Sequence, residues 1–386
     1  MENSVVSTTK ARISVPVLAL ALYAVASGYL MSLIPLMLPH YGLESSLASW
    51  LASVFYAGLL IGAMGIEPLV TKVGHRNAFV CCLIAFMATI VVLPLVPVAS
   101  LWVFARLVAG IAVAGVFVIV ESWLLHGDEA ARAKRLGLYM GSLYGGSALG
   151  QLGIGILGVS GGVPFIAILS LLILAVMVLV FGQSDQPESQ HSTPLTLKQI
   201  SKLNHAAIIG CIVSGLTLGA MYGLMPVELQ NRGINNADIG SLMAVVILGG
   251  MAVQPLVPWL SKFLGRTLLM AMFCLLGVAA ITLTTIISGL HALAIGLFLL
   301  GMATFALYPV AINLGCDKLE ASYIVSATQV MLFSYSVGSV AGPVAADWFL
   351  AGSQGLMGYL FATLLATCLY MLIASIKTKR QAVAGE

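Results

Sequence analysis

Arg106 and Glu121 are the two charged residues in a stretch, residues 101–125, that is otherwise almost wholly apolar. A charged side chain in a membrane-spanning helix costs about 2.5–3.5 kcal/mol on insertion scales, so it should face a protein interior or a water-filled path. The two residues are 15 positions apart, about 22 Å along a helix, so their side chains cannot pair directly. The sequence therefore predicts two separate functional positions on one helix.

Glu121 is the acid that lies well inside an apolar span of the first half of the chain. In one interpretation it binds a proton that is moved with a substrate. In the other it bonds to Lys72 or Arg76 and forms part of a gate at the inner face. The sequence leaves both interpretations open.

Basic residues recur at two turns between apolar spans. The first turn carries Lys72 and Arg76, and the second carries Lys262 and Arg266. Basic side chains at such turns can reach helix C-termini and a neighbouring acid, which would close the inner face. We predict a cytoplasmic gate at these four residues; the alternative is ordinary anchoring of positive charge on the inner side.

Polar and aromatic residues near the middle of several spans predict a substrate cavity. The candidates are Tyr56, Phe117, Tyr144, Gln151, Thr217, Tyr222, Thr304, Tyr308, Gln329 and Tyr335. A cavity of hydroxyls and rings suits a small organic or amphipathic solute. A highly anionic solute would need more buried cations than Arg106. Each tyrosine alone could instead be an interface anchor.

Met221 and Met225 lie at i and i+4, on one face of a helix, and thioethers suit copper(I). The following span carries no histidine to complete such a site, so copper import is a minor alternative. The six cysteines show no metal-ligating or disulfide spacing. We expect no cofactor and no bound metal.

The composition places the chain in a lipid bilayer. Of its 386 residues, 60% are hydrophobic and 8% are charged, against about 25% charged in soluble domains. Mean hydropathy is +1.06. No basic stripe with interleaved aromatic residues predicts nucleic-acid binding. The first apolar run, residues 13–38, is too long for a signal peptide and reads as the first span.

Twelve windows are long enough to cross a bilayer, which needs about 20 residues each. They begin near Ile13, Ser46, Ala78, Leu101, Leu136, Val163, His205, Ala237, Arg266, Ala292, Ile324 and Gly355. With a cytoplasmic N-terminus, every Lys and Arg except Arg106 and Arg232 falls on the inner side, so both termini are predicted to be cytoplasmic. A polar linker, 183–204, divides two predicted six-helix bundles, 1–182 and 205–386.

The two halves repeat at an offset of 191 positions. Gly58 matches Gly249, and Gly110 matches Gly301; with one inserted residue, Gly150 matches Gly342. A six-helix unit repeated in the same orientation is a parallel repeat about an axis along the membrane normal. Two such bundles can rock about a central site, so the repeat bears on mechanism.

Several motifs resemble those of the major facilitator superfamily. Residues 106–110 (RLVAG) resemble its Arg-x-x-x-Gly motif, and the two basic turns resemble its loop motif, with Thr71 and Ser261 in the usual acid position. Residues 146–150 resemble the glycine-rich motif of its exporters, but Gln151 replaces the expected proline. Residues 106–111, 120–122, 222–226, 307–311 and 335–339 together resemble the YcaD-like branch.

The resemblance implies an all-α membrane protein with twelve helices in the bacterial inner membrane. We expect a monomeric secondary active transporter, not an enzyme, that moves a small organic solute by alternating access with proton coupling. The scarcity of membrane acids leaves a uniporter or exchanger open, and a non-transporting membrane sensor is a further alternative. No nucleotide-binding, His-Glu-x-x-His or acid-pair motif appears in the spans.

Overall fold

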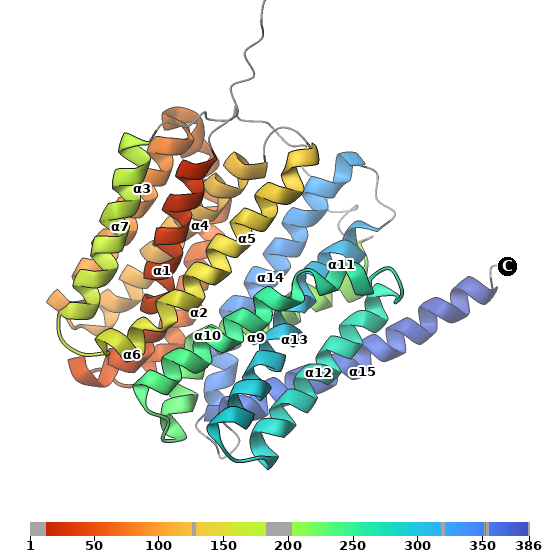
Figure 1. Ribbon diagram of the computed structural model, residues 1–386. Helices are drawn as coiled ribbons and strands as arrows, with labels where there is room; N and C mark the ends of the chain where they lie inside the picture. The colour runs from red at the N-terminus through yellow and green to blue at the C-terminus, as the bar shows by residue number, and fades with distance from the viewer. Residues whose placement is uncertain are drawn as a thin grey trace, which may run out of the picture.

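The computed structural model describes residues 13–125, 129–182, 203–317, 321–350, 352 and 355–384 (Figure 1). Within these ranges the chain forms twelve long helices and no strand. The first six are α1 (Ser14–Met37), α2 (Leu47–Gly65), α3 (Glu67–Leu95), α4 (Ala99–Leu125), α5 (Glu129–Gln151) and α7 (Val163–Phe181). The second six are α9 (His205–Asn231), α10 (Asn236–Val253), α12 (Arg266–Ile286), α13 (Leu290–Cys316), α14 (Ala321–Leu350) and α15 (Gly355–Ala384).

Three short elements lie at helix ends: η1 (Leu38–Tyr41), α6 (Gly153–Leu157) and α11 (Leu256–Leu260). Each long helix coincides with one of the twelve predicted windows, which confirms the fold class. Among the described residues, ten spans are long and apolar enough to cross a membrane by length and composition. The helices α5 and α14 are not among these ten spans. Both pack against the other half of the molecule, α5 on α10 and α14 on α2, so less of their surface faces lipid.

The helices form two bundles, the first from α1 to α7 and the second from α9 to α15 (Figure 1). Most of the predicted linker, 183–202, lies outside the described residues, so the exact domain boundaries stay a prediction. Asn204 caps α9, where its side chain accepts hydrogen bonds from the backbone N–H groups of Ala206 at 2.9 Å and Ala207 at 3.4 Å. The second bundle therefore begins with a satisfied helix N-terminus.

The 191-residue repeat is present in the helix packing. A methyl group added at Gly110 would overlap the carbonyl oxygen of Phe55, and one at Gly301 would overlap that of Val246. Both pairs differ by 191 positions. Gly58 against Leu107 and Gly249 against Phe298 repeat in the same way. The crossing of α2 on α4 is thus rebuilt as the crossing of α10 on α13, with glycines that let the backbones touch.

The turn that ends the first helix of each bundle is also repeated. Gly42 follows η1 with φ 68°, and Gly233 follows α9 with φ 79°. Both values lie in the left-handed region, which glycine adopts without steric cost. The repeated glycines therefore mark the same chain reversal in both halves.

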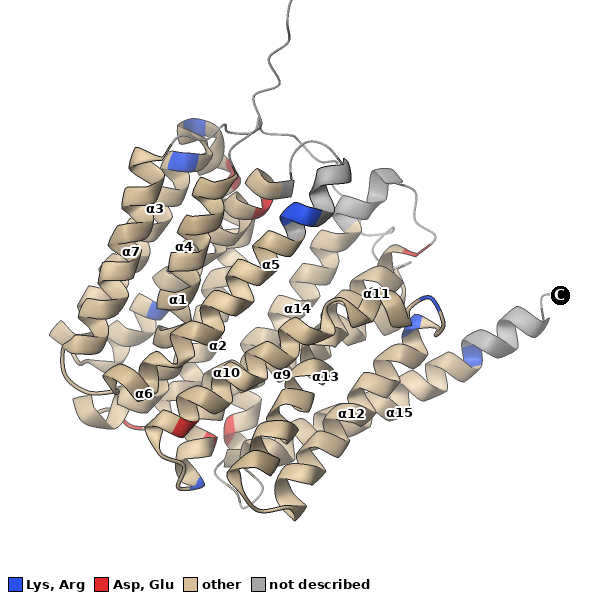
Figure 2. Cartoon of the chain, in the orientation of Figure 1, with Lys and Arg blue, Asp and Glu red and all other residues tan. Residues whose placement is uncertain are grey.

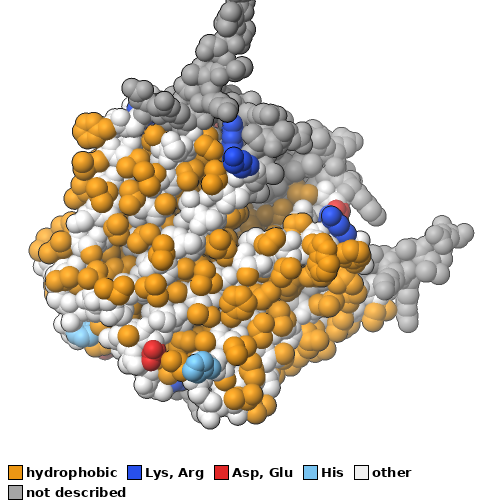
Figure 3. All heavy atoms as spheres, in the orientation of Figure 1, with side chains coloured by type: hydrophobic (Ala, Val, Ile, Leu, Met, Phe, Trp, Pro, Cys, Tyr) orange, Lys and Arg blue, Asp and Glu red, His pale blue; other side chains and the backbone are white. Residues whose placement is uncertain are grey.

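Charged residues gather at the two ends of the bundles (Figure 2). We call the end at which α1, α3, α5, α9 and α12 begin the N-terminal face, and the other end the opposite face. Lysines and arginines lie mainly at the N-terminal face, with Arg232 at the opposite face and Arg106 between them. Apolar side chains cover the surface between the ends (Figure 3). Ile166, Phe181 and Trp348 are among the large hydrophobic residues that are exposed.

Candidate functional site

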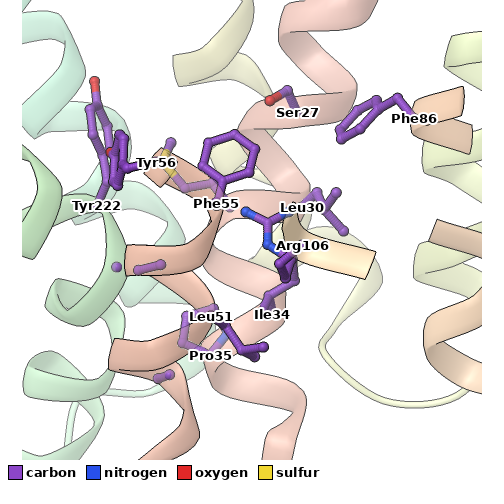
Figure 4. A pocket seen from close by; sticks show the side chains of 14 residues that line it. Ser27, Leu30, Ile34, Pro35, Leu51, Phe55, Tyr56, Phe86, Arg106 and Tyr222 are labelled. Carbon is purple, nitrogen blue, oxygen red and sulfur yellow. The ribbon is translucent and has the colours of Figure 1, made fainter. Parts of the chain in front are cut away.

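A cavity lies among α1, α2, α3, α4 and α9, so it is bounded by both bundles (Figure 4). Its empty volume is about 560 Å³, part of which is open to solvent. The lining residues are Ser27, Leu30, Met31, Ile34, Pro35, Ala48, Leu51, Ala52, Phe55, Tyr56, Phe86, Arg106, Tyr222 and Gly223. A space of this kind, mostly apolar with a few polar groups, is typical of a small-molecule site.

Arg106 supplies the charge in this cavity. Its guanidinium carbon lies 4.2 Å from the centroid of the Phe55 ring, a cation–π contact. The group lies between the Phe55 ring and the Leu30 side chain (Figure 4). The buried Nε makes no hydrogen bond, and no carboxylate pairs with the guanidinium, within the described part of the chain.

Gly110, one turn after Arg106 on α4, determines where the Arg106 side chain lies. Because Gly110 lets the backbone of α4 touch that of α2 at Phe55, the ring of Phe55 reaches the guanidinium. Residues at i and i+4 share a helix face, so Arg106 and Gly110 both point toward α2. The Arg-x-x-x-Gly motif thus combines a close helix crossing with an inward cation.

Four of the predicted cavity tyrosines make aromatic contacts near the boundary between the bundles. The rings of Tyr144 and Tyr222 lie 5.5 and 5.8 Å from that of Phe305, so one of these contacts joins α5 of the first bundle to α13 of the second. The rings of Tyr308 and Tyr335 are 4.9 Å apart. These contacts are tilted or edge-on, an arrangement that favours aromatic attraction.

Tyr56 and Tyr222 line the cavity directly. Five other predicted cavity residues lie outside its lining: Phe117, Gln151, Thr217, Thr304 and Gln329. Thr217 and Thr304 are fully buried, and each hydroxyl donates to carbonyl groups of its own helix. Gln151 is also fully buried and accepts a 2.5 Å hydrogen bond from Ser32. Phe117 packs edge-on against Tyr23, and Gln329 is exposed on α14.

Glu121 is exposed near the N-terminal face. Its Oε1 accepts a 2.9 Å hydrogen bond from the hydroxyl of Tyr139 on α5. Lys72 is exposed, and Arg76 is partly exposed. The gate interpretation expected Glu121 to bond to Lys72 or Arg76; its hydrogen-bond partner is Tyr139 instead.

Arg266 makes its contacts inside the second bundle. It forms an ion pair with Asp317 and donates a 3.1 Å hydrogen bond to the carbonyl oxygen of Asn313, both at the end of α13. Lys262 is exposed at the preceding turn. The two contacts of Arg266 tie α12 to α13, and neither of them reaches the first bundle.

The two bundles approach closely at the opposite face. A methyl group added at Gly240 would reach the backbone oxygen of Gln151, and one added at Gly155 would reach Ala237. These contacts join α5 and α6 to α10. Toward the N-terminal face the surface is hollowed between the bundles (Figure 3). Among the described residues, the structure is therefore closed at the opposite face and open toward the N-terminal face.

Residues 17–343 match the sequence description of the Major Facilitator Superfamily. The chain belongs to the Major Facilitator Superfamily. An uncharacterized MFS-type transporter of Yersinia pestis (strain Pestoides F) is 33% identical over 333 residues, which cover 84% of this chain and 85% of the relative. The uncharacterized MFS-type transporter YcaD of Escherichia fergusonii is 32% identical over 332 residues, with the same coverage of 84% and 85%. These relatives confirm the resemblance to the YcaD-like branch.

Solved structures of the Major Facilitator Superfamily share the fold. A mutant of the nucleoside transporter NupG superposes with a TM-score of 0.75 at 12% identity, covering 94% of this chain and 97% of that one. The human organic anion transporter MFSD10 (TETRAN) superposes with a TM-score of 0.63 at 17% identity, covering 93% and 98%. Membership makes this chain a multi-pass membrane transporter and not an enzyme.

Sequence reasoning missed the aromatic residues that hold this site together. Phe55 stacks on Arg106, Phe86 lines the cavity, and Phe305 contacts two of the predicted tyrosines. One signal could have found Phe55. Phe55 lies three positions before Gly58. Gly58 packs against Gly110, and Gly110 lies four positions after Arg106.

Proposed function

We propose that this chain is a secondary transporter that moves a small organic solute through the Arg106 cavity by alternating access. The observation that carries the proposal is the cavity itself, which is bounded by both bundles and contains a buried cation. Closure at the opposite face together with the hollow toward the N-terminal face corresponds to one of the two states that alternating access requires.

The charge distribution supports an N-terminal face in the cytoplasm of a bacterial cell, with the opposite face toward the periplasm. The structure then represents an inward-open state. Rocking of the bundles would break the contacts of α5 and α6 with α10 and expose the cavity to the periplasm. The predicted gate residues Lys72, Arg76, Lys262 and Arg266 would close the cytoplasmic side in that second state.

Coupling to protons belongs to the same proposal. Glu121 is exposed near the N-terminal face and bonds to Tyr139, so it can exchange a proton with the cytoplasm in this state. A uniporter or exchanger without proton coupling is the competing mechanism.

Alternating access can be tested without a known substrate. Ser27 lines the cavity, and a Ser27→Cys variant in a cysteine-free background would report access to it. A Cβ at Gly155 would lie 3.1 Å from the Cβ of Ala237. A small adjustment brings this to the disulfide range of about 3.5–4.5 Å. The pair Gly155→Cys and Ala237→Cys should therefore cross-link the periplasmic side.

We expect a membrane-impermeant maleimide to label Ser27→Cys from both sides of the membrane, in right-side-out and in inside-out vesicles. Oxidising the 155/237 pair should abolish labelling from the periplasmic side and keep it from the cytoplasmic side. Reduction should restore both, and either single cysteine serves as the control. Labelling from one side alone, or labelling that the cross-link leaves unchanged, would rule out alternating access.

A further inference from the structure

We infer that the cavity recognises a monovalent organic anion, whose carboxylate binds Arg106 while an apolar or aromatic body packs beside Phe55 and Phe86. This inference rests on the proposed transport function and names its substrate class. It is argued from the surroundings of Arg106, from the corresponding position in the second bundle and from the other groups of the cavity.

Arg106 has no counter-ion within the part of the chain that the structure describes. Its Nε is buried without a hydrogen bond, and no carboxylate pairs with it among the residues the structure describes. The other polar side chains that line the cavity, Ser27, Tyr56 and Tyr222, carry no negative charge in their ordinary state at physiological pH. The cation–π contact with Phe55 offsets only part of the cost of burying a guanidinium.

The internal repeat shows what occupies the equivalent position in the second bundle. The position equivalent to Arg106, 191 residues later, is Leu297, which is fully buried between the helices. The glycine crossing next to it is the same in both bundles, Gly110 on Phe55 and Gly301 on Val246. The helix packing therefore does not require a cation at this position. The arginine is an addition to the scaffold, and its guanidinium faces the cavity.

The cavity carries a single positive charge. Arg106 is the one charged residue among the fourteen that line the cavity. The remaining polar groups there, the hydroxyls of Ser27, Tyr56 and Tyr222, can orient a carboxylate but not neutralise a second charge. A guanidinium binds a carboxylate through two parallel hydrogen bonds. One cation thus fits one carboxylate.

The apolar residues that line the cavity indicate the chemical character of the rest of the ligand. Leu30, Ile34, Leu51 and Phe86 are almost completely buried around the guanidinium. Figure 4 shows Ser27 and Phe86 at one end of the cavity and Tyr56 and Tyr222 at one side. Such walls favour flat apolar groups over sugars or zwitterions, because a polar body would lose hydration without replacement hydrogen bonds.

The test uses matched acids and amides that differ in charge and hardly in shape. The probes are benzoate with benzamide, indole-3-acetate with indole-3-acetamide, and 4-phenylbutyrate with 4-phenylbutyramide. Each is titrated against the purified full-length protein, and the dose-dependent rise in melting temperature gives its affinity. The neutral amides partition more strongly into detergent micelles, so non-specific effects work against the expected result.

We expect at least one acid to bind at least tenfold more tightly than its amide. Arg106→Gln should abolish the preference, and Arg106→Lys should keep part of it because the charge remains. If Arg106→Gln does not fold, the inference is tested by comparing the affinities for acid and amide in the wild-type protein and in Arg106→Lys. Equal binding of acid and amide, no binding by any acid, or an acid preference that survives in Arg106→Gln would overturn the inference.

The two experiments fail separately. Loss of acid preference with two-sided labelling of Ser27→Cys intact would refute the anion and leave transport standing. One-sided labelling with acid preference intact would refute transport and leave an anion-binding membrane protein.

Discussion

The hydroxyl of Tyr139 on α5 donates a 2.9 Å hydrogen bond to Oε1 of Glu121 on α4. Two helices of the first bundle are thereby joined beside the hollow that opens toward the N-terminal face. The bond holds one oxygen of the carboxylate in place on a residue that is exposed near the N-terminal face. That combination is suited to a group that takes up and releases a proton.

Replacing Glu121 with Gln keeps a hydrogen-bond acceptor for Tyr139 and removes the titrating group. If Glu121 carries the proton, a pH gradient should no longer drive accumulation of a binding carboxylate in proteoliposomes, whereas exchange of labelled for unlabelled solute should continue. Tyr139→Phe keeps the carboxylate and should retain gradient-driven accumulation. Wild-type accumulation by Glu121→Gln would exclude the proton site and favour the uniporter or exchanger.

Glu228 connects the end of α9 at the opposite face to the start of α15. Its Oε1 accepts a 2.9 Å hydrogen bond from Nε of Arg232, and its Oε2 accepts one of 2.9 Å from the backbone N of Leu356. We expect Glu228→Ala to cost about 2–4 kcal/mol of stability, because it leaves a buried N–H and an arginine without their acceptor. A clearly lowered melting temperature would show this.

The matched controls separate the two contacts of Glu228. Arg232 is partly exposed, so Arg232→Ala should cost only about 0.2–1 kcal/mol. Glu228→Gln keeps an acceptor for Leu356 and should fall between the two. A melting temperature of Glu228→Ala equal to that of Arg232→Ala would show that the contact with α15 adds nothing.

Gly110 and Gly301 should respond to substitution in the same way, because each lies against a backbone carbonyl at an equivalent crossing. Gly110→Ala and Gly301→Ala should each destabilise the protein by about 1–3 kcal/mol, the usual cost of overpacking. Gly141→Ala and Gly145→Ala are the controls, since a Cβ there meets nothing within 4 Å. Helix propensity should make these two neutral or stabilising by up to about 1 kcal/mol. The melting temperatures of the four variants test this prediction.

Asp317→Asn removes the ion-pair partner of Arg266 at the end of α13. Because the two side chains are 30% and 44% exposed, we expect a stability change below about 1 kcal/mol. Labelling of Ser27→Cys from the periplasmic side should also stay unchanged, because Asp317 belongs to the same bundle as Arg266. A large change in that labelling would instead assign the ion pair to the cytoplasmic gate.

Hydropathy predicted the helices because a bilayer requires long apolar segments whose backbone groups are satisfied internally. It could not tell which face of an apolar helix is turned to the cavity. Nearly every position of α2 is apolar, so the contact of Phe55 with Arg106 leaves no periodic signal. Packing of glycine against a carbonyl oxygen sets that face.

Hydroxyl side chains show the same limit. In the sequence, Thr217 and Thr304 resemble Tyr222, since all are polar groups in the middle of a span. In the structure the threonine hydroxyls bond to their own helices, as short hydroxyl side chains can, while the longer tyrosine reaches the cavity. Side-chain length, combined with helix rotation, separates the two groups.

The single cation beside Phe55 has an electrical consequence. A bound monoanion neutralises Arg106, so the cavity of the loaded carrier crosses the membrane without net charge. The empty carrier returns with the positive charge of Arg106. Each complete cycle therefore moves one negative charge in the direction of transport. At 100 mV, negative inside, that charge is worth about 2.3 kcal/mol, or about a 50-fold concentration ratio directed outward. A carrier without a coupling ion would therefore drain the cell of its solute. Import against that voltage needs at least one proton per anion, and a 1:1 cycle would generate no current in a voltage-clamped membrane.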